Sequence, residues 1–121
     1  MAITIIKTNQ NIASSTIVKD TDVNGSLVPN ATSTDGSLYS IEVVNPNTDW
    51  VYFKLADVLT GSAGATAPVV VFAATASATS SVLYPDGITF QNGFSHWCTI
   101  SPSGSVVSDP TSQVVVTYVT L

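Results

Sequence analysis

The residues with the widest chemical repertoire are one histidine, His96, and one cysteine, Cys98. In an extended strand, residues two positions apart share a face with α-carbons about 6–7 Å apart, so a Cys–His pair is conceivable here. Phe94 and Ile100 fall on the same face, and free cysteine is among the residue types most often buried. We therefore expect His96 and Cys98 to pack in a core, and we expect no enzymatic activity.

The closest acidic residues, Asp20 and Asp22, precede Asn24 and Gly25 in a string that imitates the start of a calcium loop. Such a loop also needs a closing glutamate, and the corresponding position is Ala31. One histidine and one cysteine cannot supply the four ligands of a structural zinc site. We expect an Asn-Gly turn here, with no metal, and the absence of glycine-rich nucleotide motifs predicts no cofactor.

The overall composition limits the possible partners. The chain has 121 residues, 45% apolar and 9% charged, whereas about 25% charged residues is typical. Three lysines and no arginine supply no basic cluster for nucleic acid or for an anionic membrane surface. The N-terminal residues lack the basic and apolar regions of a secretion signal, so we expect none, and the longest apolar run, 67–74, is too short for a membrane helix. We expect one globular domain over residues 1–121 that binds neither nucleic acid nor membrane.

The pattern along the chain favours strands. β-Branched residues are abundant, no helical periodicity is found, and turn-forming pairs such as Asn24-Gly25 and Asp35-Gly36 recur at short spacing. We predict an all-β fold, an antiparallel β-sandwich or jelly roll, and a tight hairpin at Asn92-Gly93. The expected strands are about nine: 2–7, 14–20, 37–45, 49–58, 68–74, 79–84, 87–91, 94–101 and 112–120.

Several apolar or aromatic side chains are candidates for an interface. Trp50 and Tyr52 alternate with core positions, and Trp97 lies opposite His96 in its strand. Exposed aromatics mark protein interfaces or sugar-stacking platforms, although loops can also cover them. Segments 68–72 and 114–119 are apolar on both faces, so either loops or a neighbouring subunit must cover the second face. The candidate contact residues are Trp50, Tyr52, Trp97, Val114, Val116 and Tyr118.

The second half of the chain carries a family resemblance. The motifs are the strand Trp50-Val-Tyr-Phe-Lys-Leu55, the segment starting at Ala67-Pro68, and Pro85-Asp-Gly-Ile-Thr-Phe90 followed by Asn92-Gly93-Phe94. With the valine-rich last strand, residues 47–121 resemble small β-sandwich proteins encoded by tailed bacteriophages. The resemblance implies no catalytic residues.

The resemblance implies a non-enzymatic virion structural protein, assembled in the host cytoplasm. A capsid decoration (cement) protein that stabilises the shell by contacting the major capsid protein or other virion proteins is the leading expectation. Such proteins form symmetric homo-oligomers, and capsid three-folds favour a trimer. It remains open whether the first strands, about residues 1–46, form an arm exchanged between subunits. The alternative is a tail-fibre or adhesin module that binds surface glycans.

Overall fold

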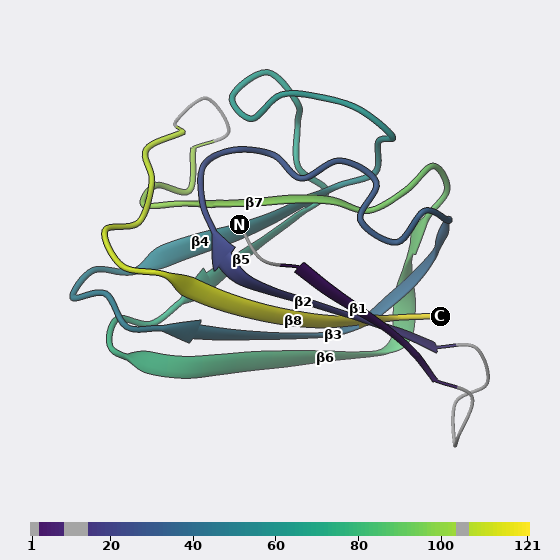
Figure 1. Ribbon diagram of the computed structural model, residues 1–121, viewed down its shortest axis with the longest axis horizontal. Helices are drawn as coiled ribbons and strands as arrows, with labels where there is room; N and C mark the ends of the chain where they lie inside the picture. Colours follow the sequence, from purple (N-terminus) through teal and green to yellow (C-terminus); the bar gives the residue numbers. More distant parts are fainter. Residues whose placement is uncertain (1–2, 9–14, 104–106) are drawn as a thin grey trace.

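The chain folds as an all-β sandwich, as the sequence predicts. The structure, a computed structural model, describes residues 3–8, 15–103 and 107–121. It contains two antiparallel sheets with eight strands among the described residues (Figure 1). The strands are β1 (Ile3–Thr8), β2 (Ser15–Val23), β3 (Gly36–Asn45), β4 (Val51–Ala56), β5 (Val70–Ala74), β6 (Ala78–Phe90), β7 (Ser95–Thr99) and β8 (Val114–Thr120).

The two sheets differ in size. The large sheet has the strand order β1-β2-β8-β3-β6, and the small sheet has the order β5-β4-β7. Figure 1 shows the small sheet above the large sheet, with long loops above the small sheet and no described segment across the lower face of the large one. None of the described residues forms a helix that is long and apolar enough to cross a membrane.

Alternating side chains from the two sheets fill the core. In β4, Val51, Phe53 and Leu55 are fully buried, which confirms the predicted core face of that strand. In β8, Val114, Val116 and Tyr118 are buried against them, while the residues between point to the other side of the large sheet. These three were predicted as interface contacts, and that prediction is wrong because the core of the same chain already covers them.

The predicted strands 79–84 and 87–91 form one strand, β6. Pro85 interrupts neither the strand nor the sheet, because β6 lies at the edge, where a missing N–H costs no ladder hydrogen bond. The pairing with β3 instead shifts register between Leu38 and Ser40, and Gly87 adopts a φ of 74° at this bend. Glycine takes this conformation at little cost, which allows the strand to bend without ending.

The Asn92-Gly93 hairpin predicted from the sequence is wrong. The strands on either side of it, β6 and β7, belong to different sheets, so this turn carries the chain from one layer to the other. The Asp57 carboxylate holds it, accepting hydrogen bonds from the N–H groups of Gln91, Asn92 and Gly93 at 2.9, 2.7 and 3.2 Å. The determinant therefore lies more than thirty residues away in the chain.

The outer edge of β7 is covered by an irregular segment, residues 24–31. Val28 and His96 exchange backbone hydrogen bonds of 2.8 and 3.0 Å, and the Cys98 N–H donates to the Asn24 carbonyl at 2.8 Å. Ile100, which was predicted on the core face with Phe94, is 47% exposed because β7 ends at Thr99 and the chain then turns away. This segment leaves β5 as the uncovered edge of the small sheet.

The N-terminal part of the chain is built into the large sheet. β1 pairs with β2, β2 pairs with β8, and β8 pairs with β3. Val18, Val23 and Leu38 from β2 and β3 belong to the core cluster. The exchange of this region between subunits stays a prediction.

The Asp57 cap predicts a pH-dependent contribution to stability. Burial alone would raise the pKa of this carboxyl group, but the three backbone N–H donors outweigh burial and leave the pKa below its ordinary value. The contribution is therefore present above the ordinary pKa, about 4, and is lost as the pH falls through the lower folded-state value. Asp57→Asn should lower the free energy of unfolding at neutral pH by about 1 kcal/mol and flatten its acid dependence.

Urea unfolding at a series of pH values measures both effects. Asp86→Asn is the matched control, because Asp86 is exposed and no hydrogen bond holds its side chain to a described residue. Equal losses in the two variants would contradict the role of Asp57.

Candidate functional site

Three polar side chains meet inside the sandwich. His96 of β7 contacts Asp20 of β2 through Nε2 and Oδ2 at 2.8 Å, and Tyr118 of β8 through Nδ1 and the hydroxyl oxygen at 2.9 Å. The side chains of His96 and Asp20 are 0% and 1% exposed, and Tyr118 is fully buried. The remaining Asp20 oxygen, Oδ1, accepts the N–H of Asp22 at 3.0 Å. This buried network joins the two sheets.

The direction of each hydrogen bond follows from the chemistry of the groups. An ionised carboxylate only accepts, so His96 Nε2 carries a hydrogen and donates to Asp20. In the neutral ring, Nδ1 then accepts from the Tyr118 hydroxyl. Burial raises the pKa of Tyr118, and the nearby Asp20 charge raises it further, so the phenol keeps the proton that it donates.

The order hydroxyl, imidazole and carboxylate is that of a catalytic triad, but the environment is that of a core. A triad acts only where its nucleophile can reach a substrate. Here all three groups are sealed by surrounding strands, and the Phe53 ring packs 5.8 Å from the rings of both His96 and Tyr118, between centroids. We assign the network a structural role.

Cys98 is not activated by His96. The two residues share the inner face of β7, as predicted, but both nitrogens of the histidine are taken by Asp20 and Tyr118. Cys98 is fully buried, and burial raises the pKa of its thiol to about 12, with smaller opposing effects from Lys54 and a backbone hydrogen bond. A thiol in this state is a poor nucleophile.

Lys54 is a further buried ionisable group, although it alternates in β4 with the core residues Phe53 and Leu55. Its side chain is 0% exposed, and Nζ donates to Thr99 Oγ1 at 2.9 Å and to the Ser103 carbonyl at 2.7 Å. Burial lowers the pKa of the ammonium group, partly offset by Cys98. A lysine of this kind can act as a nucleophile when a cavity gives access to it, but it does not line the pocket described below.

The calcium-like string does not form an ion-binding loop. β2 continues through Val23, and the Asp20 carboxylate points inward to His96. Asn24 closes a local turn, its Oδ1 accepting the Ser26 N–H at 2.9 Å. Across residues 3–8, 15–103 and 107–121, no three histidine, cysteine, aspartate or glutamate side chains group closely enough to hold a metal ion.

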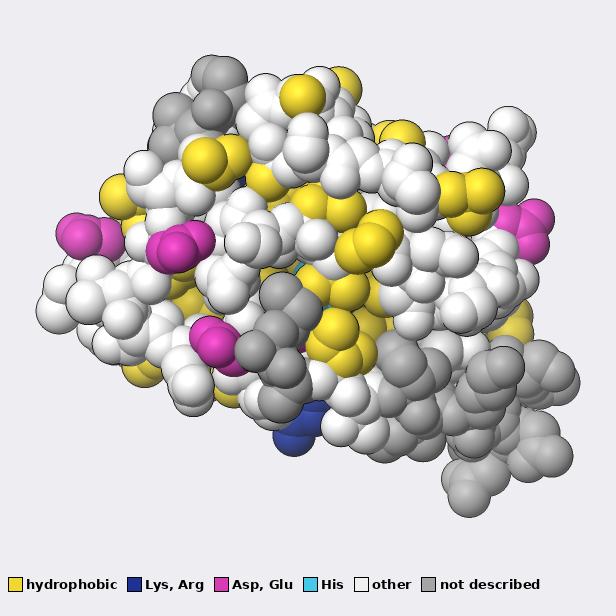
Figure 2. Space-filling model, turned by 45° about the horizontal axis from the view of Figure 1, so that its top comes forward, with side chains coloured by type: hydrophobic (Ala, Val, Ile, Leu, Met, Phe, Trp, Pro, Cys, Tyr) yellow, Lys and Arg dark blue, Asp and Glu magenta, His cyan; other side chains and the backbone are white. Residues whose placement is uncertain are grey.

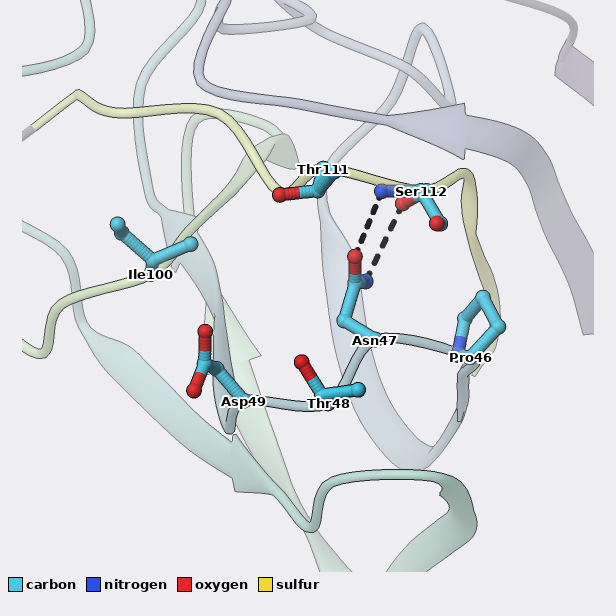
Figure 3. A pocket seen from close by; sticks show the side chains of 7 residues that line it. All are labelled: Pro46, Asn47, Thr48, Asp49, Ile100, Thr111 and Ser112. Carbon is cyan, nitrogen blue, oxygen red and sulfur yellow. Dashed lines mark hydrogen bonds between the residues drawn. The ribbon is translucent and has the colours of Figure 1, made fainter.

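A shallow pocket of about 200 Å³ lies where the turn between β3 and β4 meets the segment before β8. Figure 3 shows the Asp49 carboxylate and the hydroxyls of Thr48 and Thr111 pointing into the pocket beside Ile100. Asn47 forms the wall: its Oδ1 accepts the Ser112 N–H at 2.6 Å and its Nδ2 donates to the Ser112 carbonyl at 3.2 Å. The pocket therefore offers one carboxylate and two hydroxyls on a wall that internal hydrogen bonds hold in place.

The outer face of the small sheet is divided into a covered and an open part. Trp97, predicted as an exposed contact, is 0% exposed, and the prediction is wrong because the chain beyond each strand folds back over this part of the sheet. Ser103 contacts Lys54 beside Trp97, and the Ser95 hydroxyl donates to the Val58 carbonyl at 2.7 Å. The aromatic residues were expected either to form an interface or to be covered by loops, and Trp97 is covered by loops.

The open part of that face is apolar. Trp50 is 48% exposed, Tyr52 is half-buried, and Val69 and Val71 of the neighbouring segment are 55% and 44% exposed. Tyr52 pairs with Ala73 in the register of β4 and β5, so these side chains share one surface. We call Trp50, Tyr52, Val69 and Val71 the apolar strip. The sequence pattern identified Trp50 and Tyr52 of the strip. The exposure of Val69 and Val71 follows from the position of β5 at the edge of the small sheet, which only the structure shows.

The comparisons with known proteins leave the family open. No protein-family model matches the chain, and no match was found among the curated proteins or among the solved structures.

The buried network predicts a specific loss of stability. Tyr118→Phe removes the hydroxyl and leaves His96 Nδ1 buried without its partner, so the free energy of unfolding should fall by about 1–3 kcal/mol. Tyr52→Phe is the matched control, since no hydrogen bond joins the Tyr52 hydroxyl to a described residue, and it should change stability little. Guanidinium unfolding followed by tryptophan fluorescence measures both variants, and equal effects would contradict a structural role for the network.

The state of Cys98 predicts its reactivity. The folded protein should resist alkylation by iodoacetamide at about pH 8, because the thiol is both inaccessible and protonated. The same protein in guanidinium should take up one equivalent, which mass spectrometry measures. Rapid labelling of the folded chain would show that Cys98 is accessible.

Proposed function

We propose that this chain is a non-enzymatic structural protein of a tailed-phage virion, and specifically a capsid decoration protein. The observation that carries the proposal is the apolar strip, which leaves Trp50 and two valines exposed at the edge of the small sheet. Exposed apolar surface of this kind marks a contact with another protein. The histidine, cysteine and Lys54, by contrast, are all enclosed in the fold.

The sparse surface charge supports a contact that depends on apolar burial. Figure 2 shows one face with apolar side chains in its middle, acidic side chains spaced around them and almost no basic colour. Residues 47–121, which resemble phage β-sandwich proteins, include the whole apolar strip. A decoration protein that buries the strip against the major capsid protein would stabilise the assembled shell by mass action.

Co-sedimentation with undecorated shells of the cognate phage tests the proposal. The wild-type chain should sediment with the shells, and Trp50→Ala or Val71→Ala should weaken binding at least about 10-fold, since exposed aromatic anchors dominate interfaces. Leu121→Ala is the control: Leu121 is 45% exposed and follows β8 of the large sheet, whereas the strip lies on the small sheet. Failure of the wild-type chain to sediment would overturn the proposal.

A glycan-binding tail module is the second candidate, and the pocket is the observation that favours it. Its carboxylate and hydroxyls, beside the apolar side chain of Ile100, suit one sugar unit, and Trp50 follows Asp49 directly in the chain. Saturable binding on a glycan array that Asp49→Ala abolishes, with shell binding absent, would select this function. Shell binding that survives Asp49→Ala would select the decoration protein.

A further inference from the structure

The large sheet presents an outer face that no described segment covers (Figure 1). Strand register fixes which side chains stand in line across it. One row crosses the four strands β2, β8, β3 and β6, and its side chains are mostly apolar. It consists of Ile17, Val119, Ser40 and Leu83. Leu83 is 75% exposed, the most of any large apolar residue described.

The next row carries two charges of opposite sign. It consists of Lys19, Thr117, Glu42 and Ser81 in the same strand order. Lys19 and Glu42 stand on either side of β8, two strand spacings or about 10 Å apart. No hydrogen bond or ion pair joins either side chain to another described residue. Beyond this row lie Val115 and Val44, which pair with each other and are half-buried and 37% exposed.

We propose that this face binds a second copy of the chain, forming a two-fold dimer whose axis runs along β8. The structure places one cation and one anion at equal distances on opposite sides of β8. Rotation about that axis brings Lys19 of each copy over Glu42 of its partner, and it brings Val119 and Val115 over their own equivalents. A contact between identical patches of this kind is isologous and closes after two copies.

The charges select this axis over the other two-fold arrangement of stacked faces. An axis across the strands, along the row of Lys19 and Glu42, would place Lys19 over the partner's Lys19 and Glu42 over the partner's Glu42, and like charges in contact are unfavourable. Stacked sheets lie about 10 Å apart, a gap that a lysine and a glutamate side chain span together. The usual offset of about 30° between packed sheets moves the row of Lys19 and Glu42 least, because that row lies nearest the middle of the face.

The size of the face indicates a reversible dimer. Rotation about β8 lays β2 over the partner's β3 and β6 over the partner's β1. Five strands of about six residues make a face of about 20 by 20 Å, so the pair hides an area at or below the lower limit of stable interfaces. We therefore expect dissociation in the micromolar range rather than an obligate dimer. This inference goes beyond the proposed function, because it concerns the pure protein and a face of the other sheet.

Sedimentation equilibrium of the purified full chain, from about 1 µM to about 1 mM, tests the dimer. The wild-type chain should associate to a dimer. Glu42→Lys and Lys19→Glu should each shift dissociation to at least about 10-fold higher concentration, and the double variant, which exchanges the charges, should restore the dimer. Asp49→Lys is the control, because it makes the same charge reversal in the turn before the small sheet, and it should leave the dimer intact.

Restoration by the charge exchange distinguishes the dimer face from a general effect of net charge. A wild-type chain that stays monomeric at about 1 mM, that forms trimers, or whose association is unchanged by Glu42→Lys would overturn the inference. So would a double variant that fails to re-associate while circular dichroism shows it folded. Shell binding by Trp50→Ala is measured separately, so either proposal can fail alone.

Discussion

A carboxylate buried between two β-sheets must keep every one of its hydrogen-bond partners, because an unpaired charge in the interior is strongly destabilising. Asp20 meets this condition through His96, and His96 in turn through Tyr118. Each of the three sits at a fixed register, with Asp20 opposite Val116 and His96 opposite Leu55. A slip of one residue in β2, β7 or β8 would turn a polar group to the other face. The network therefore ties the alignment of both layers to one another.

This use of the histidine leaves the surface to provide function. The reactive side chains, His96, Cys98 and Lys54, are buried in the fold. The exposed features are two apolar surfaces, one on each sheet. The face of the small sheet combines aromatic rings with an edge strand and has no charge of its own on the exposed strip. The face of the large sheet alternates apolar rows with one row that contains Lys19 and Glu42. The face of the small sheet suits a different protein, whereas the face of the large sheet is self-complementary and suits a second copy of the chain.

Local patterns in the sequence predicted the class of fold and most strands, because alternation over five or more residues is a property of the strand itself. They failed where a distant residue decides the outcome. The Asp57 carboxylate directs the chain at Asn92 into the other sheet, and loop cover buries Trp97. The buried network was missed because Asp20 resembles part of a calcium loop and Tyr118 lies in a strand that is apolar on both faces. Its one visible signal is that Asp20 shares the core-facing parity of Val18.

The free backbone groups at the edges of the sheets determine whether further chains can add to the molecule as extra strands. Segment 24–31 already satisfies the free backbone of β7, and Pro85 together with the bend at Gly87 leaves the outer edge of β6 without a regular run of N–H donors. An incoming strand therefore finds no long, regular template at either position, which disfavours growth of ribbons by strand addition. The other two edge strands, β1 and β5, are only six and five residues long, and short edges are weak templates for an added strand. In a molecule rich in valine and poor in charge, these edges favour association through side chains on the sheet faces over amyloid-like fibres.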